Sequence, residues 1–168
     1  MRTCRGTIYT RACRLIVAGV LVGVCGLLSS CLRGRVYSHY ADIPGEGWRQ
    51  GDTLTFCTDT IRNDGSYLSM VGVRIKEDMP YRGISILVEQ EIRKQGEVRD
   101  ILSDTVDCEF VDDKGSRTGP GISRYQYTFP IRSQQLSHGD SLTVRLTHLM
   151  TTDTFPAVTE VGYILTRE

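Results

Sequence analysis

The segment VGVRIKEDMPYRGISILVEQEI, residues 71–92, decides the expected fold. Apolar side chains alternate with other residues on both sides of a central break: Val71, Val73 and Ile75, then Ile84, Ile86, Val88 and Ile92. This period of two is typical of strands with one buried face. The break, MPYRG at 79–83, holds a proline and a glycine, which commonly separate strands. The segment therefore predicts two half-buried strands.

The same alternation extends over most of the chain. Turn residues separate the strands, among them NDG at 63–65 and DDKGSRTGPG at 112–121, which we expect to form a long hairpin loop. Residues 94–103 are polar and ambiguous, and 151–156 are expected to form a loop. The in-phase apolar sets are Tyr37, His39 and Ile43; Leu54 and Phe56; Val106, Cys108 and Phe110; Tyr125, Tyr127, Phe129 and Ile131; Leu142, Val144 and Leu146; and Val161, Tyr163 and Leu165. This pattern predicts an all-β, antiparallel β-sandwich of about seven to eight strands, with a β-barrel as the alternative.

The N-terminus has the features of a secretory signal. Four arginines and no acidic residue precede the apolar run LIVAGVLVGVCGLL at 15–28, which is shorter than the roughly 20 residues that span a bilayer. The run ends in Leu28, Ser29, Ser30 and Cys31, which resemble a bacterial lipobox. By that resemblance Cys31 is the lipid attachment site and carries the acyl chains of the mature protein. An uncleaved membrane helix is the alternative.

These features predict three parts of the chain. Residues 1–30 are a lipoprotein signal peptide, 31–35 are the lipidated cysteine and a short tether, and 36–168 are the β-sandwich domain. Leu32 is not the aspartate that marks inner-membrane retention in the lipoprotein pattern, and Arg33 and Arg35 replace the acidic cluster associated with surface export. By these resemblances the protein lies at the periplasmic face of the outer membrane.

Charge and cysteine content limit the partners and the chemistry. Cleavage of the signal peptide would remove four of the 20 basic residues and none of the 20 acidic ones, so the mature chain has a net charge of −4. This balance argues against nucleic acid as a partner. Cys57 and Cys108 are the remaining thiols. Because side chains alternate between the two faces of a strand, Cys57 is expected on the face opposite Phe56, and Cys108 is expected on the core face. This favours a buried, unpaired Cys108. A bulge in either strand would allow a disulfide.

No arrangement of residues indicates catalysis or a metal. His39, His138 and His148 are far apart, and the inward phase of His148 favours a core histidine. The loop at Asp112 and Asp113 lacks the alternating oxygen ligands of a calcium loop. Glu89 and Glu91 have the spacing of a glycosidase pair, although a solvated acidic face explains them more simply. We expect a protein that is not an enzyme and has no cofactor.

Aromatic residues suggest a second kind of site. Tyr37, Tyr40, Trp48 and Tyr81 form a possible aromatic contact surface, together with Tyr67 and Tyr125. Such a surface would stack on sugar rings, so a glycan-binding envelope lipoprotein is the alternative function. Packing at the ends of the sandwich is the simpler interpretation of the same residues.

Several short motifs occur together with the lipobox. They are VYSHY at 36–40, Ile43-Pro44, Gly47-Trp48, DTLTF at 52–56, VGVRI at 71–75, Pro80-Tyr81, ISILVEQ at 84–90, His148 and Val161-Gly162-Tyr163. The mature chain resembles the gliding motility lipoprotein GldH family of the Bacteroidetes over nearly its whole length. It departs from the family at Met79-Pro80-Tyr81, where Tyr-Pro is usual, and at Glu160-Val161-Gly162, where Asp-Val-Gly is usual. The resemblance implies a non-enzymatic, membrane-anchored lipoprotein that is required for gliding and associated with type IX secretion. Its partners would be the lipid bilayer and other envelope proteins.

Overall fold

The computed structural model describes residues 34–168, and every regular element in this range is a β-strand. The predicted signal peptide, the lipobox with Cys31, and Leu32 and Arg33 lie outside the described residues. Within them, no helix is long and apolar enough to cross a membrane. The strands are β1 (Arg35–Asp42), β2 (Trp48–Arg49), β3 (Leu54–Cys57), β4 (Gly65–Lys76), β5 (Gly83–Lys94), β6 (Glu97–Glu109), β7 (Arg124–Leu136), β8 (Asp140–His148), β9 (Thr154–Phe155) and β10 (Val158–Arg167).

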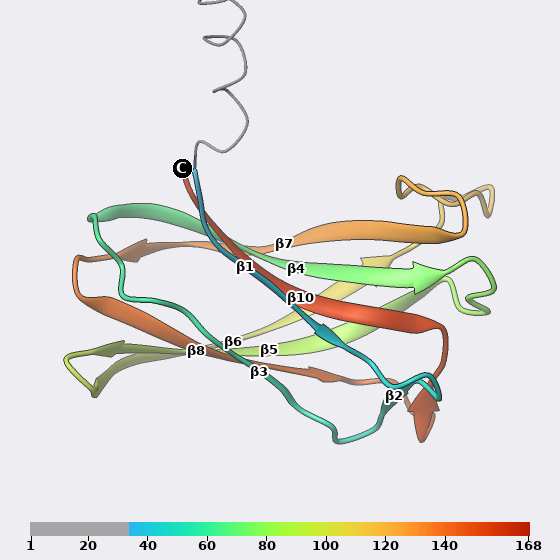
Figure 1. Ribbon diagram of the computed structural model, residues 1–168, viewed down its shortest axis with the longest axis horizontal. Coiled ribbons are helices and arrows are strands. Elements are labelled where there is room, and N and C mark those ends of the chain that lie inside the picture. The colour runs from blue at the N-terminus through green and yellow to red at the C-terminus, as the bar shows by residue number, and fades with distance from the viewer. Residues whose placement is uncertain (1–33) are drawn as a thin grey trace, which may run out of the picture. The chain divides into compact units, whose positions relative to one another are not determined.

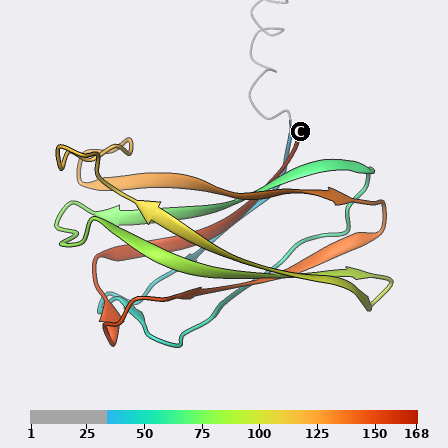
Figure 2. The same cartoon turned by 180° about the vertical axis from the view of Figure 1, so that it is seen from behind.

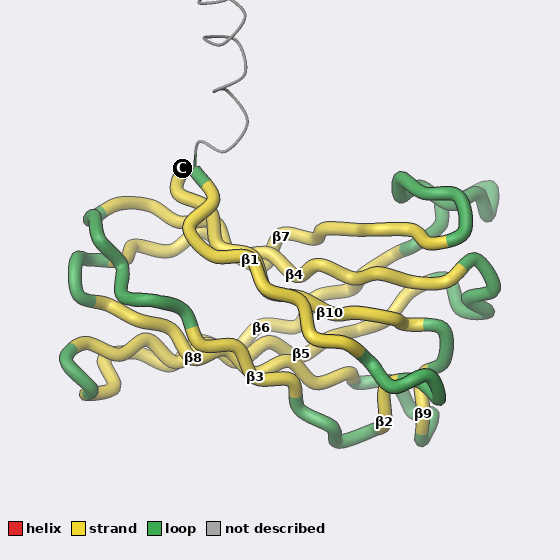
Figure 3. The backbone as a smooth tube through the Cα atoms, viewed as in Figure 1, coloured by secondary structure: helices red, strands yellow, loops and turns green. Residues whose placement is uncertain are grey.

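Two four-stranded antiparallel sheets pack face to face (Figure 1). The first sheet has the order β1-β10-β4-β7, and the second sheet has the order β3-β8-β5-β6. The short strands β2 and β9 pair at one end (Figure 3). The predicted β-sandwich is thus confirmed, and the barrel alternative is wrong for the described domain because its sheets remain separate. The two-residue strands raise the count above the predicted seven to eight.

The hydrophobic core forms from the strand faces that carry the alternating apolar residues. Val71, Val73 and Ile75 of β4 are fully buried, as are Ile86 and Val88 of β5. Alternate residues of β8 complete the pattern, with Val144 and Leu146 also fully buried. These side chains lie between the sheets, as in other aligned sandwiches. The segment at 71–92 therefore supplies one inner strand to each sheet.

The connections differ from the sequence prediction in two places. The loop at 112–121 was expected to close a hairpin, but it crosses from β6 of the second sheet to β7 of the first. The true hairpin joins β5 and β6, and its turn places Gln95 and Gly96 at φ 52° and 87°. Positive φ at both central residues is typical of a type I′ turn, which matches the twist of paired strands. The ambiguous segment at 94–103 thus contains this turn and the start of β6.

A polar cluster lies in the centre of the core and joins the two sheets. The Oε1 atom of Gln90, from the second sheet, accepts hydrogen bonds from Ser69 Oγ at 3.0 Å, Tyr163 Oη at 2.9 Å and Gln134 Nε2 at 3.3 Å. The three donors belong to the first sheet. Burial raises the pKa of the Tyr163 phenol, which keeps this group neutral. We name Ser69, Gln90, Gln134 and Tyr163 the core polar cluster.

A second structural feature lies on the outer face of the first sheet. Gly72 and Gly162 are cross-strand partners, and Gly162 is also the partner of Tyr40 on β1. The Tyr40 ring covers both glycines: a Cβ atom added at Gly72 would lie 2.2 Å from Tyr40 Oη, and one at Gly162 would lie 2.7 Å from the ring. The guanidinium of Arg74 lies 4.2 Å from the centroid of the same ring. The glycines therefore make room for an aromatic ring that lies flat on the sheet.

Candidate functional site

The four residues of the predicted aromatic surface do not share one surface. Tyr37 and Tyr40 are three residues apart on β1, so their side chains lie on opposite faces of the strand. Tyr37 packs against Tyr163 with ring centroids 6.0 Å apart, whereas Tyr40 lies on the outer face of the sheet. Burial raises the pKa of both phenols above the ordinary value of 10.0. A stacking platform built from both side chains is therefore excluded.

Trp48 is part of the core, which corrects its place in the predicted surface. It is 1% exposed, and its indole Nε1 donates a hydrogen bond to the backbone oxygen of Asp52 at 3.0 Å. The ring packs edge-on against His148 at 5.2 Å. Tyr81 stacks on Phe155 of β9 at 4.7 Å. These rings fill the end of the sandwich near β2 and β9, so packing accounts for them.

The histidines do not form a site. His148 is 2% exposed and its Nδ1 accepts a hydrogen bond from the backbone nitrogen of Met150 at 3.3 Å, so the predicted core histidine is confirmed. His39 packs near Phe56 at 6.2 Å, and His138 lies in an exposed turn. Among residues 34–168, no three His, Cys, Asp or Glu side chains are grouped so that they could hold a metal ion.

The two glutamates of β5 differ in their surroundings. Glu89 is exposed, as a solvated face predicts, but Glu91 is only 9% exposed. The Glu91 carboxylate pairs with Arg93 and lies 3.7 Å from Arg145. The simple interpretation of two solvated acids is therefore wrong for Glu91, because two guanidinium groups surround it. This ion-paired arrangement leaves no free carboxylate pair facing a common substrate.

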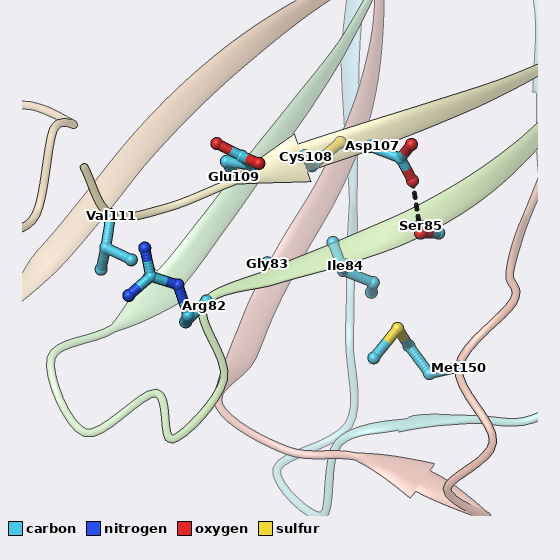
Figure 4. Close-up of a pocket in the computed structure, with 9 residues that line it drawn as sticks. All are labelled: Arg82, Gly83, Ile84, Ser85, Asp107, Cys108, Glu109, Val111 and Met150. Atoms are coloured by element: carbon cyan, nitrogen blue, oxygen red, sulfur yellow. Dashed lines mark hydrogen bonds between the residues drawn. The ribbon is translucent and has the colours of Figure 1, made fainter. Parts of the chain in front are cut away.

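A cavity of about 270 Å³ opens where β5 begins and β6 ends (Figure 4). Ser85 Oγ donates a hydrogen bond to Asp107 Oδ1 at 2.5 Å at one edge of it. Arg82 lines the other end, and its guanidinium donates to the backbone oxygen of Asp112 at 3.0 Å. None of the nine lining residues is a histidine or a lysine. The serine thus has a carboxylate partner but neither a histidine nor a lysine beside it among the lining residues.

Cys57 and Cys108 are both free thiols. Cys57 lies on β3 and Cys108 on β6, at opposite edges of the second sheet. Three strand spacings separate the two strands, so the cysteines are at least about 14 Å apart, which is far beyond the reach of a disulfide. Cys57 is exposed and Cys108 is 1% exposed, as alternation predicts. Desolvation raises the pKa of the Cys108 thiol to about 12.

We expect a maleimide at pH 8 to modify Cys57 in the folded protein and to leave Cys108 unmodified until the domain unfolds. Only about one part in 10⁴ of a thiol with a pKa near 12 is ionised at pH 8, and the thiolate is the reacting form. Peptide mapping by mass spectrometry after labelling, with and without urea, measures both sites. Equal labelling of the two cysteines without urea would contradict the buried position of Cys108.

The same thiol should make stability depend on alkaline pH. The folded state keeps the Cys108 proton up to a pKa of about 12, whereas the unfolded chain loses it near the ordinary value of 9.0. The thiol contribution is thus fully present below pH 9 and is lost as pH rises from 9 toward 12, by up to about 1.4 kcal/mol per pH unit. Urea unfolding of the protein and of Cys108→Ala between pH 8 and 11 isolates this contribution.

The most exposed strand in the second sheet is β6. It pairs with β5 along one edge, and its first five residues are all exposed. Two large apolar side chains project there, Val98 at 49% and Ile101 at 66% exposure. Arg99 pairs with Asp140 of β8 in the same sheet at 2.9 Å, and Asp104 pairs with Arg132 of β7 in the first sheet at 2.8 Å. We name residues 97–102 the exposed β6 edge. The pattern of alternating apolar residues did not predict this edge because the segment is mostly polar.

The sequence profile of the GldH lipoproteins matches residues 35–165, which is most of the chain. The chain belongs to the GldH lipoprotein family. The family extends over every strand from β1 to β10, so its shared sequence pattern coincides with the sandwich. The identification from sequence motifs is thus confirmed. No curated protein matches the chain.

Solved structures share general features with this GldH lipoprotein. A protein from Sulfurospirillum deleyianum has 10% identity and a TM-score of 0.47, with 79% of this chain and 98% of that chain covered. A CocE/NonD family hydrolase from Staphylococcus aureus has 9% identity and a TM-score of 0.35, with 80% and 32% covered. The CBM22-1–GH10 modules of xylanase 10B from Clostridium thermocellum have 10% identity and a TM-score of 0.38, with 82% and 29% covered. At these scores, none of them bears on function.

Family membership supports a coarse description of the role. The protein is a lipoprotein associated with gliding motility, and a lipoprotein of this family is anchored to a membrane of the cell envelope. The anchoring cysteine, the leaflet and the way the domain acts belong to the proposals that follow.

Proposed function

We propose that this protein is a non-enzymatic envelope lipoprotein that is anchored through Cys31 and acts by binding other proteins of the gliding and type IX secretion machinery. By the lipoprotein pattern at 32–35, it would face the periplasm from the outer membrane. Membership of the GldH family supports the cellular role. The observation that carries the mode of action is the exposed β6 edge.

An exposed edge strand presents unpaired backbone groups to a partner. A partner segment in extended form can add to such an edge, because its backbone forms the hydrogen bonds and its side chains enter neighbouring sites. Val98 and Ile101 supply apolar contacts on this edge, at 49% and 66% exposure. The Arg99 guanidinium pairs with Asp140 and donates to the backbone oxygen of Gln135 on β7 at 3.4 Å. The exposed β6 edge thus combines a strand that is paired within its sheet on one side only with two hydrophobic contact residues.

Replacing Ile101 with aspartate tests this function, with Ile122→Asp as the matched control. Both isoleucines are exposed, at 66% and 89%, but Ile122 lies in the loop before β7. In a host whose spreading or secretion depends on this gene, Ile101→Asp is expected to reduce complementation several-fold at unchanged protein level in the membrane. Ile122→Asp should complement fully. A photo-crosslinking residue at position 101 should capture an envelope protein that the same residue at position 122 does not.

Two outcomes would contradict the proposal. If Ile101→Asp complements as well as the unchanged protein, the exposed β6 edge has no role in function. If the unchanged protein extracted from the membrane carries no acyl chains on Cys31, the anchor is wrong. Mass spectrometry of the membrane-extracted protein, which measures acylation of Cys31 directly, separates the second result from the first.

A further inference from the structure

The outer face of the first sheet carries apolar side chains where a solvated face would be polar. Met70 of β4 has Pro130 of β7 and Ile164 of β10 as its cross-strand partners, and Leu68 lies two residues before it on the same face. Ile164 is 4% exposed but lies outside the core cluster of the described domain, as do the other three. We name Leu68, Met70, Pro130 and Ile164 the apolar face.

The outer face of the second sheet is different. Its central strand β8 presents Thr143, Arg145 and Thr147 on the outward phase, next to Glu89 and Glu91 of β5. Antiparallel sheets commonly have one packed face and one polar, solvated face. On the second sheet, the exposed apolar side chains Val98 and Ile101 lie on the edge strand β6, and Leu87 is the one apolar residue on this face of β5. On the first sheet, by contrast, Leu68, Met70 and Ile164 lie on the inner strands β4 and β10. The first sheet therefore has an outer face that is suited to being covered.

Strand β1 begins on the side of this apolar face. β1 begins at Arg35, and the backbone nitrogen of Arg167 donates to the oxygen of Gly34 at 2.7 Å, so the start of β1 and the C-terminus lie together. Figures 1 and 2 show this end of the domain projecting from the first sheet, away from the second. The first described residues, Gly34 and Arg35, therefore lie at the end of the domain that projects from the first sheet.

The connection to the proposed anchor is short. Only Leu32 and Arg33 separate Cys31 from Gly34, and an extended chain spans about 3.5 Å per residue, so the Cα atoms of Cys31 and Gly34 are at most about 11 Å apart. Acyl chains on Cys31 would lie in the bilayer. A tether of this length keeps the domain next to the lipid headgroups. The surface nearest to the lipid is then the side on which the chain enters.

We propose that the apolar face rests on the lipid bilayer in which Cys31 is anchored, an inference that depends on the proposed anchor. Arg35 and Arg167, both exposed, lie at the tether end and can meet lipid phosphates. Glu168 lies at the same end, and Ser66 and Ser133 donate hydrogen bonds to its carboxylate. The acidic residues Asp42 and Glu160 lie at the opposite end of the face, with Tyr40 between. In this proposal, the half of the apolar face next to Arg35 and Arg167 contacts lipid.

Site-specific fluorescence on the acylated protein tests this orientation. Met70→Cys places a probe on the apolar face, and Thr143→Cys places one on the central strand of the second sheet, both in a Cys57→Ser background. Each is labelled with an environment-sensitive nitrobenzoxadiazole dye in vesicles of phosphatidylethanolamine and phosphatidylglycerol. Because an interfacial apolar surface enters the headgroup region, headgroup nitroxide lipids should quench the probe at position 70 by about twofold or more. The probe at position 143 should be unaffected.

The native methionines give a second measurement that needs no substitution. Met70 lies on the apolar face and Met150 lines the cavity at the end of the second sheet. When the acylated protein binds vesicles, hydroxyl-radical oxidation of Met70 should become several-fold slower than in the unacylated protein in solution. The oxidation rate of Met150 should not change.

Each outcome has one meaning. Acylated protein that floats with vesicles but shows equal quenching at positions 70 and 143, and equal protection of both methionines, overturns the orientation and leaves the anchor intact. A blue shift at position 70 that depends on protein density, without lipid quenching, also overturns it and indicates a second copy or a protein partner on the face. If the protein does not float with vesicles, the Cys31 anchor is refuted, and the proposed orientation, which depends on that anchor, is refuted as well.

Discussion

Replacing Gln90 with leucine is expected to destabilise the domain by about 2–4 kcal/mol, measured as the free energy of unfolding in urea. Leucine has nearly the volume of glutamine, so packing changes little. The Oε1 atom of Gln90, however, is the common acceptor for Ser69, Gln134 and Tyr163. The cost therefore comes from donors that lose their partner where water does not reach them.

Not every donor in the core polar cluster loses all of its hydrogen-bond partners in Gln90→Leu. Ser69 Oγ and Tyr163 Oη are 2.8 Å apart and can bond to each other, and Gln134 Nε2 donates to Ser69 Oγ at 3.1 Å. Each hydroxyl has one proton, so without Gln90 at least one donor in the core polar cluster stays unpaired. Each unpaired buried donor costs about 1–3 kcal/mol. The Nε2 atom of Gln90 has no partner in the folded domain, and its removal offsets part of this cost.

An apolar version of the cluster is the control. Adding Ser69→Ala and Tyr163→Phe to Gln90→Leu removes both hydroxyl donors, so most of the lost stability should return. If the triple variant is as unstable as Gln90→Leu alone, packing rather than hydrogen bonding explains the loss. If Gln90→Leu unfolds at the same urea concentration as the unchanged domain, the cluster contributes nothing to stability.

The inner strands could be predicted because their alternation has one dominant cause. Val71, Val73 and Ile75 are apolar since one face of β4 is buried, and the same holds for the set on β5. Gln90 occupies an inward position of β5, where alternation predicts an apolar residue. A polar residue in an inward phase is the sequence signal for a buried hydrogen-bonded cluster, but its partners lie on three other strands. Sequence spacing does not determine which strands meet.

The surfaces were harder to predict for the same reason. The exposed β6 edge and the loop at 112–121 depend on which sheet each strand joins, and local residue patterns contain no information on that choice. The apolar face had a usable signal: Leu68 and Met70 on β4, and Ile164 on β10, fill outward positions and make these segments almost continuously apolar. Continuous runs are typical of strands covered on both sides. The predicted aromatic surface failed because ring type alone does not distinguish an exposed tyrosine from a buried Trp48.

Replacing Gly72 with alanine is expected to destabilise the domain by about 1–3 kcal/mol, since overpacking has this cost in well-packed sites. The new Cβ would lie 2.2 Å from Tyr40 Oη and 2.6 Å from Tyr40 Cζ, so the ring has to leave its place. The ring would then lose its contact with the sheet and with Arg74, 4.2 Å from its centroid. Urea unfolding of Gly72→Ala measures this loss.

A double-mutant cycle with Tyr40→Ala tests whether the ring is the cause. In the Tyr40→Ala background, Gly72→Ala should be neutral or slightly stabilising, because alanine is favoured over glycine within strands by about 0.5–1 kcal/mol. Gly162→Ala should remain destabilising in that background, because its Cβ would also lie 2.7 Å from the backbone oxygen of His39. Backbone on a paired strand cannot move as a side chain can. The two glycines are partners in register, so a difference in rescue between them assigns the clash at Gly72 to the tyrosine ring and that at Gly162 to strand β1 itself.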